Sequence, residues 1–168
     1  VNDYTSNRAI ASGYLGVQND GAGLDINYRN IRVRVDADQS TDLARGRPVT
    51  ASSVEPGSAH VAANAVDGNS ATRWGSAYSD PQWMVVDLGQ TRAINRVRLT
   101  WETAYGRAYQ LQTSNDNSTW TTAYSTTTGD GGVDDVTVTG SGRYVRVLGT
   151  QRATQWGYSL WDLNVFGS

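Results

Sequence analysis

The sequence predicts an all-β protein folded as an antiparallel β-sandwich or jelly roll. Apolar and polar residues alternate in short stretches, which clusters of turn-forming residues separate at regular intervals. Eighteen Gly and many Thr, Ser, Val, Trp and Tyr residues favour strands and turns over helices. With 168 residues, the chain is long enough for one sizeable sandwich core. We therefore expect one complete domain with a small appendage.

The strands are expected where the alternation is clearest. In NRVRLTWE, the apolar residues Val97, Leu99 and Trp101 share one face of a strand, which predicts that they enter the core. The same core expectation covers Trp83, Trp120 and Tyr144. Candidate strands, separated by turn signals such as SNDN (114–117) and GDGG (129–132), are residues 47–53, 82–88, 93–102, 107–113, 118–124, 133–139, 142–149 and 158–166.

The beginning of the chain differs from the rest. Residues 1–36 predict two short strands around a Gly-containing hairpin, and two strands alone are marginal in water. We interpret this segment as the terminal strands of a preceding β-sandwich domain. Residues 37–42 are then a linker, and residues 43–168 the main domain.

Charge and composition exclude several functions. The net charge of −2 and the isoelectric point near 5.2 offer no basic surface for nucleic acid or an anionic membrane. All fourteen basic residues are Arg, and the absence of Cys excludes thiol catalysis and Cys-based zinc sites. No apolar run approaches the roughly 20 residues that span a bilayer.

Catalytic signatures are also absent from the sequence. The one histidine, His60, lies in a Gly- and Ala-rich loop without a recognisable nucleophile elbow, and we expect it to be solvated. Asp134 and Asp135 are adjacent and point to opposite faces of a strand, so they do not form a glycosidase pair. A catalytic alternative would require Glu55 and Glu102 at glycosidase spacing. Our interpretation is that the chain is not an enzyme.

The two Glu residues of the chain fall at the ends of predicted strands, close to aromatic residues or turns. A sugar site needs charged groups that hydrogen-bond to hydroxyls and aromatic rings that cover sugar C–H groups. The candidate carbohydrate-binding residues are Glu55, Arg73, Tyr78, Glu102, Trp156, Tyr158 and Trp161, with Tyr105 also nearby in sequence.

The segment NAVDGNSATRWGSAYSD (64–80) has three possible interpretations: an ordinary Asp-Gly turn, half of a metal loop or the rim of a sugar site. It fails the EF-hand pattern, which needs several carboxylates and a terminal Glu. Calcium can still be held by one or two carboxylates with backbone and hydroxyl oxygens. The spacing alone leaves these alternatives open.

From Leu43 to Gly167 the chain resembles the discoidin, or coagulation factor type C, domains, and most closely the bacterial family 32 carbohydrate-binding modules. The motifs that carry this resemblance occur in order and are TASS (50–53), NAVDGNSATRW (64–74), SDPQWMVVDLG (79–89), INRVRLTWE (94–102), YQLQTSNDNSTW (109–120), GRYVRVLGT (142–150) and WGYSLWDLNVFG (156–167). The resemblance implies a discoidin-like jelly roll, an antiparallel β-sandwich without catalysis, attached to secreted glycan-active enzymes.

The resemblance also implies one structural Ca²⁺. Carried over by motif, its ligands are Asn64 (carbonyl), Asp67, Asn69, Thr72, Trp161 (carbonyl) and Asp162. Asp162 stands where the family more often has Glu, a side chain one methylene longer. The ion would join the first long loop to the last strand.

Among the family's members, SAYSDPQW and WETAYG are similar to motifs of modules that bind β-glucan or chitosan oligosaccharides. This implies a site formed by Glu55, Arg73, Tyr78, Glu102 and an aromatic residue of 156–161. Galactose-binding members use a His and a different polar set. Two Glu residues near one Arg suit an amino sugar, but the Arg could also neutralise one Glu and leave a hydroxyl-reading site.

Residues 1–36, with GYLGVQNDG and YRNIRVRV, are similar to the terminal strands of concanavalin-like domains of the 3-keto-glycoside hydrolase type. We therefore expect a secreted, monomeric module that binds polysaccharide or oligosaccharide and belongs to a longer polypeptide with a catalytic domain. Nucleic acid and membrane are not expected partners. The alternative is a discoidin-type adhesion module for a protein or membrane surface, which the polar loops SVEPGSAH and SAYSDPQ disfavour.

Overall fold

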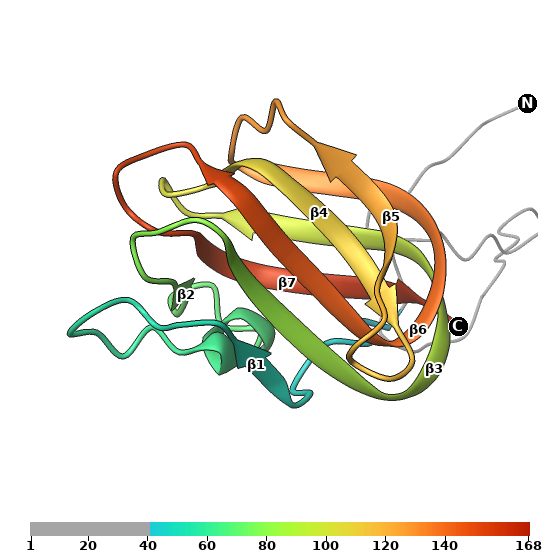
Figure 1. The fold of residues 1–168 in the computed structure, drawn as a ribbon. Coiled ribbons are helices and arrows are strands. Elements are labelled where there is room, and N and C mark those ends of the chain that lie inside the picture. Colours follow the sequence, from blue (N-terminus) through green and yellow to red (C-terminus); the bar gives the residue numbers. More distant parts are fainter. Residues whose placement is uncertain (1–40) are drawn as a thin grey trace, which may run out of the picture. The chain divides into compact units, whose positions relative to one another are not determined.

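The structure is a computed structural model that describes residues 41–168 (Figure 1). The strands predicted within residues 1–36 and most of the linker at 37–42 lie outside the described residues. The elements, in chain order, are β1 (Val49–Ala51), the 3-10 helix η2 (Ala62–Val66), β2 (Trp74–Gly75), β3 (Gln82–Trp101), β4 (Gly106–Ser114), β5 (Thr121–Thr126), β6 (Val133–Arg152) and β7 (Ser159–Gly167).

The strands form an antiparallel sandwich in which β3 and β6 belong to both layers. The first half of β3 pairs with β1 and with the second half of β6, which continues to β4 and β5; we call this the β4 layer. The second half of β3 pairs with β7 and the first half of β6, and β2 extends β7; we call this the β7 layer. The all-β, discoidin-like jelly roll expected for this part of the chain is confirmed.

Both long strands bend at the same edge of the sandwich, at the right of Figure 1. The β3–β6 register shifts between Asp87 and Arg92, where Gly89 has a φ of 84° that favours glycine. Arg143 braces the bend with two 2.8 Å hydrogen bonds to the Asp87 carboxylate. The predicted strands 82–88 and 93–102 are therefore one strand, as are 133–139 and 142–149.

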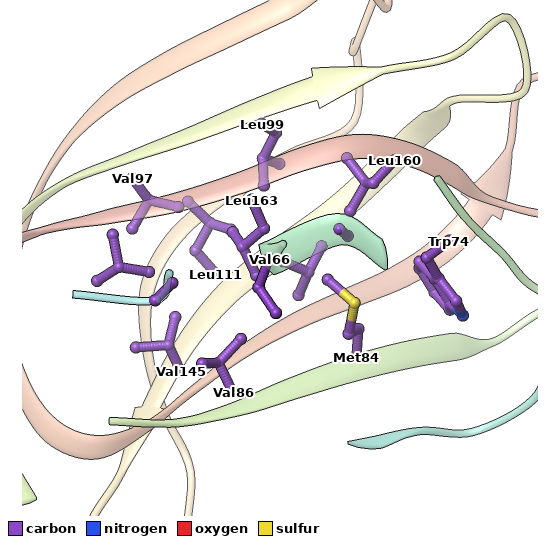
Figure 2. Close-up of a cluster of buried hydrophobic side chains, with 14 of the residues drawn as sticks. Val66, Trp74, Met84, Val86, Val97, Leu99, Leu111, Val145, Leu160 and Leu163 are labelled. Carbon is purple, nitrogen blue, oxygen red and sulfur yellow. The ribbon is translucent and has the colours of Figure 1, made fainter. Parts of the chain in front are cut away.

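Side chains from the two layers and from η2 meet in one core (Figure 2). Val97, Leu99 and Trp101 are buried as the alternation of β3 predicts, and the indole N–H of Trp101 donates to Asp134 at 2.8 Å. Trp74 is 2% exposed and packs inward. The labelled members of the cluster in Figure 2 include Val66, Met84, Leu111, Val145, Leu160 and Leu163.

The core expectation for Trp83, Trp120 and Tyr144 is wrong, because all three are only partly buried. Trp83 pairs with Leu148, and both alternate with core-facing neighbours, so they lie on the outer face of the β4 layer. The Arg146 guanidinium lies 4.0 Å from the centre of the Trp120 ring. An aromatic residue in an alternating strand can therefore belong to the outer face as well as to the core.

The connections opposite the bend carry the candidate site. Residues 52–61, 76–81, 102–105 and 153–158 connect the strands at the left end of Figure 1. β2 and η2 were not expected from the sequence. Within residues 41–168, no helix is long and apolar enough to cross a bilayer.

Candidate functional site

A pocket of about 400 Å³ opens among these connections. Its walls combine two carboxylates, one guanidinium, three small hydroxyl-bearing residues and three aromatic residues. The residues that line it are Glu55, Arg73, Gly75, Ser76, Tyr78, Glu102, Thr103, Ala104, Trp156, Gly157, Tyr158 and Ser159.

Glu55 is held by donors on three sides. Its Oε2 accepts hydrogen bonds from His60 Nδ1 at 2.5 Å and from Arg73 Nη2 at 2.9 Å. Its Oε1 has only a longer contact, with the Tyr78 hydroxyl at 3.3 Å. Burial would raise the pKa of Glu55, but the bonds from His60 and Arg73 outweigh it and hold the pKa below its usual value. Glu55 is therefore anionic at neutral pH, and one of its oxygens remains accessible to a ligand.

Local backbone geometry fixes this arrangement. The Glu55 amide donates to the Gly75 carbonyl at 2.7 Å, and the Gly75 amide donates to the His60 carbonyl at 3.0 Å. A Cβ on Gly75 would lie 2.7 Å from Glu55 Oε2 and 2.9 Å from Arg73 Nη1. Because only a hydrogen fits there, Gly75 allows both charged groups to close over the backbone.

Glu102 forms the second anionic wall. Burial would raise its pKa, but hydrogen bonds from the Ala104 amide (3.0 Å) and from Thr103, together with the Arg73 charge, keep the pKa below its usual value. Arg73 also donates from Nη1 to the Ser159 hydroxyl at 2.8 Å. The guanidinium is thus anchored by Glu55 and Ser159, and its charge also acts on Glu102.

Two aromatic rings form the exposed rim. Tyr78 and Trp156 meet edge to face with their ring centres 5.4 Å apart, and 40% and 51% of the two residues are exposed. Arg152 holds the loop that carries Trp156, since its Nη1 donates to the carbonyls of Gln155 and Trp156. Asp80 in turn accepts from Arg152 Nε at 3.3 Å. A partly exposed apolar rim beside partly buried charges suits a ligand with both hydroxyl-bearing and C–H faces.

The structure brings together six of the seven carbohydrate-binding residues predicted from the sequence, and Trp161 is not among the residues lining the pocket. Tyr158 forms a buried wall, and its hydroxyl donates to Asp80. Sequence reasoning missed Gly75 and Ser159.

The expectation that His60 is merely solvated is wrong, because its ring bonds to Glu55. The five-residue separation of these residues in a loop gives no periodic signal. The contact follows from the path of the loop, which the sequence does not reveal.

None of the six predicted calcium ligands lines the pocket. The Asp67 carboxylate accepts from the Asn69 amide (2.7 Å) and the Thr72 hydroxyl (2.8 Å). Burial raises the pKa of Asp162, and the nearby carboxylates of Asp67 and Asp42 raise it further. Within residues 41–168, no three acidic or histidine side chains gather into a metal site. A cation here would therefore depend on neutral oxygens as well.

The backbone next to Asp162 and the guanidinium of Arg45 both affect the predicted calcium site. The β3–β7 register passes from Asp162 to Leu160 and skips Trp161, so a local irregularity lies at the predicted carbonyl ligand. A Cβ on Gly68 would lie 2.1 Å from the guanidinium carbon of Arg45, which therefore sits over the Asp67–Gly68 turn. Coulombic attraction to Arg45 partly offsets the pKa rise of Asp162. The donor set fits a hard cation that shares two carboxylates with amide, hydroxyl and carbonyl oxygens.

Comparison with protein families gives one match. A family model described as a NedA-like, galactose-binding domain of the F5/F8 type C group matches residues 64–147, half of the chain.

Solved structures give closer likenesses. Chitosan-binding module 1 of a chitosanase/glucanase from Paenibacillus sp. IK-5 is 51% identical, with a TM-score of 0.72 over 76% of this chain and 99% of that one. Module 2 of the same enzyme, in complex with chitotriose, is 50% identical with a TM-score of 0.72, over 75% of this chain and all of that one. The family 32 module of Clostridium perfringens NanJ, in complex with galactose, is 24% identical with a TM-score of 0.61, over 71% and 92% of the two chains, and shows the shared fold alone.

A curated relative places a similar segment in a larger protein. The polysaccharide lyase 8 family protein HylA of Enterococcus faecalis is 33% identical over an alignment of 104 residues, which covers 57% of this chain and 8% of that protein. The chain therefore matches only a small part of that protein.

Proposed function

Because the chain belongs to the NedA-like, galactose-binding domain family of the discoidin-like F5/F8 type C group, we propose that it is a non-catalytic module that holds a glycan-active enzyme on an amino-sugar polysaccharide of the chitosan type. The observation that carries this proposal is the presence of two anionic carboxylates, Glu55 and Glu102, in one pocket with exposed aromatic residues at its rim. The pocket would receive one sugar residue, and Tyr78 and Trp156 would cover its C–H face.

Charge favours an amino sugar over a neutral one. Arg73 is the one guanidinium lining the pocket, and it is already bonded to Glu55, so the three charged side chains sum to one negative charge. A ligand ammonium would compensate that charge and donate to Glu55 Oε1 and to Glu102. The 50–51% identity to two chitosan-binding modules supports this choice.

A neutral β-glucan is the second candidate for the same pocket. Its hydroxyl groups could bond to both carboxylates, but would leave the extra negative charge without a partner. For either sugar we expect a dissociation constant between about 1 mM and 1 μM, since an open pocket buries only part of a chain.

We also propose a structural Ca²⁺ held by Asn64, Asp67, Asn69, Thr72, Trp161 and Asp162. Burial raises the pKa of Asp162, the carboxylates of Asp67 and Asp42 raise it further, and Arg45 only partly offsets this rise. When bound, the ion would neutralise this repulsion and join the segment before β2 to β7.

The wider setting is part of the proposal. Homologous segments occur in a chitosanase/glucanase and in a polysaccharide lyase. We propose that this module likewise acts as a monomer within a secreted polypeptide that carries a catalytic domain.

A glycan titration tests the proposal. The protein is titrated calorimetrically with chitotriose, a β-glucan trisaccharide and galactose, and the Glu55→Ala and Glu102→Ala variants are compared with Asp135→Asn as a control carboxylate outside the pocket. Chitotriose should bind wild type and the control equally, and both alanine variants should lose most of that binding. Absence of binding to every glycan would overturn the module assignment, and release of product would overturn the non-catalytic assignment.

A further inference from the structure

The His60 side chain reaches the sugar pocket through Glu55. It does not line the pocket, yet its Nδ1 makes the shortest hydrogen bond to Glu55 Oε2. The loop holds the ring in place, because the His60 amide donates to the Ser58 hydroxyl (3.2 Å), which itself donates to the Glu55 carbonyl (2.9 Å). This closed set of bonds joins Glu55 and His60 by both backbone and side chains.

The two nitrogens of the ring have different roles. Nδ1 carries a hydrogen in order to donate to the carboxylate, so Nε2 of the neutral ring has a free lone pair. With 36% of its side chain exposed, His60 can take up a second proton from solvent. That proton adds a full positive charge without breaking the bond to Glu55.

We infer that His60 is a specificity-determining positioning residue: it orients Glu55 toward the pocket, and its own charge sets how strongly the pocket prefers a cationic sugar to a neutral one. This inference rests on the proposed function. With neutral His60, the set of Glu55, Glu102, Arg73 and His60 has one net negative charge. With protonated His60 the set is neutral, and its attraction for a sugar ammonium is weaker.

The groups that surround Glu55 allow this control. Arg73 faces it from the segment before β2, Tyr78 from the segment after β2, and Glu102 lies across the pocket at the end of β3. Histidine is the residue type that ordinarily changes charge between about pH 5 and 8. Glu55 and Glu102, whose pKa values are lowered, stay ionised over that interval, so a pH-dependent preference within this set would arise from His60.

The test compares wild type with His60→Asn, which keeps a donor near the Nδ1 position but cannot titrate. Chitotriose binding is measured at pH 7.5 and pH 5.5 in low salt, and the ratio of the two dissociation constants, wild type over variant, is taken at each pH. The ligand amine titrates over the same interval, but its effect cancels in this ratio. The ratio should rise about three- to tenfold at the lower pH, as expected for one added charge several ångströms from the ligand. For a neutral β-glucan trisaccharide, the ratio of the two dissociation constants should stay near one at both pH values.

Two further variants separate charge from geometry. Tyr78→Phe removes a different hydrogen bond to Glu55 without a group that titrates in this interval, so its pH profile should follow wild type. His60→Ala should weaken chitotriose binding at pH 7.5, where it removes only the hydrogen bond that orients Glu55, and His60→Asn should restore binding at that pH. Chitotriose binding by wild type with a pH-independent ratio would overturn the role of His60 alone. Absence of binding by wild type would overturn the proposed function together with this inference.

Discussion

Glu55 and Asp162 are two partly buried carboxylates whose surroundings differ in charge. Glu55 receives hydrogen bonds from His60, Arg73 and Tyr78, and its pKa is lowered. Burial raises the pKa of Asp162, and the nearby carboxylates of Asp67 and Asp42 raise it further. The protein therefore supplies the partners of Glu55 before any ligand arrives, whereas Asp162 would gain from the proposed cation. One carboxylate belongs to a preorganised pocket and the other to a proposed site that a cation would complete.

Removal of calcium should have the largest effect and should act on stability alone. We expect exhaustive chelation to lower the melting temperature by about 10 °C, equivalent to about 3 kcal/mol for an ion present at some hundredfold its dissociation constant. The complex with saturating sugar should persist at 25 °C. Differential scanning calorimetry with and without chelator measures the shift, and Asp162→Asn should abolish it. An unchanged melting temperature in wild type would show that no calcium is bound.

Substitution of a charged pocket residue should lower the affinity for sugar and leave the stability of the free protein nearly unchanged. Glu102→Gln preserves the shape of the side chain but removes its charge, so chitotriose affinity should fall about tenfold to a hundredfold, the range for a hydrogen bond to a charged group. The melting temperature of the free protein should change little. Titration calorimetry and thermal unfolding on one sample check both parts, and equal affinity in variant and wild type would exclude an ionic role for Glu102.

The aromatic rim of the pocket should contribute less to the binding free energy than the charged side chains do. Trp156→Ala should weaken oligosaccharide binding about fivefold, because one aromatic contact contributes roughly 1 kcal/mol to the binding free energy. Trp120→Ala is the matched control, because it removes an indole on the outer face of the β4 layer. Similar losses in both variants would argue against a specific role for Trp156.

The smallest effect concerns the pH dependence of stability. Because the folded-state pKa of Glu55 is lowered, its ionised form stabilises the fold above the unfolded-state pKa, and this contribution is lost as the pH falls through the folded-state value. The melting temperature of wild type should therefore exceed that of Glu55→Gln at pH 7, and the difference should shrink toward pH 3. A difference that grows in acid would contradict the bonding described for Glu55.

The sequence predicted the sandwich because apolar residues alternate with polar ones in segments such as Val97 to Trp101, where β3 buries Val97, Leu99 and Trp101. It did not predict that β3 and β6 each pass through both layers, since Gly89 and Gly140 resemble turn residues that end a strand. Most of the pocket followed from Glu, Arg and aromatic residues near strand ends. His60 and Gly75 did not, because their roles depend on distances within loops, which have no periodic pattern.

We propose that the preformed negative charge of the pocket selects an amino sugar. The most direct measurement is the affinity of one protein sample at pH 6 for chitotriose and for its fully N-acetylated counterpart, which has the same linkage but no ammonium groups. Chitotriose should bind at least about tenfold more tightly, the effect of a charge-assisted hydrogen bond of about 1.4 kcal/mol. Equal affinities, or tighter binding of the acetylated sugar, would contradict this proposal.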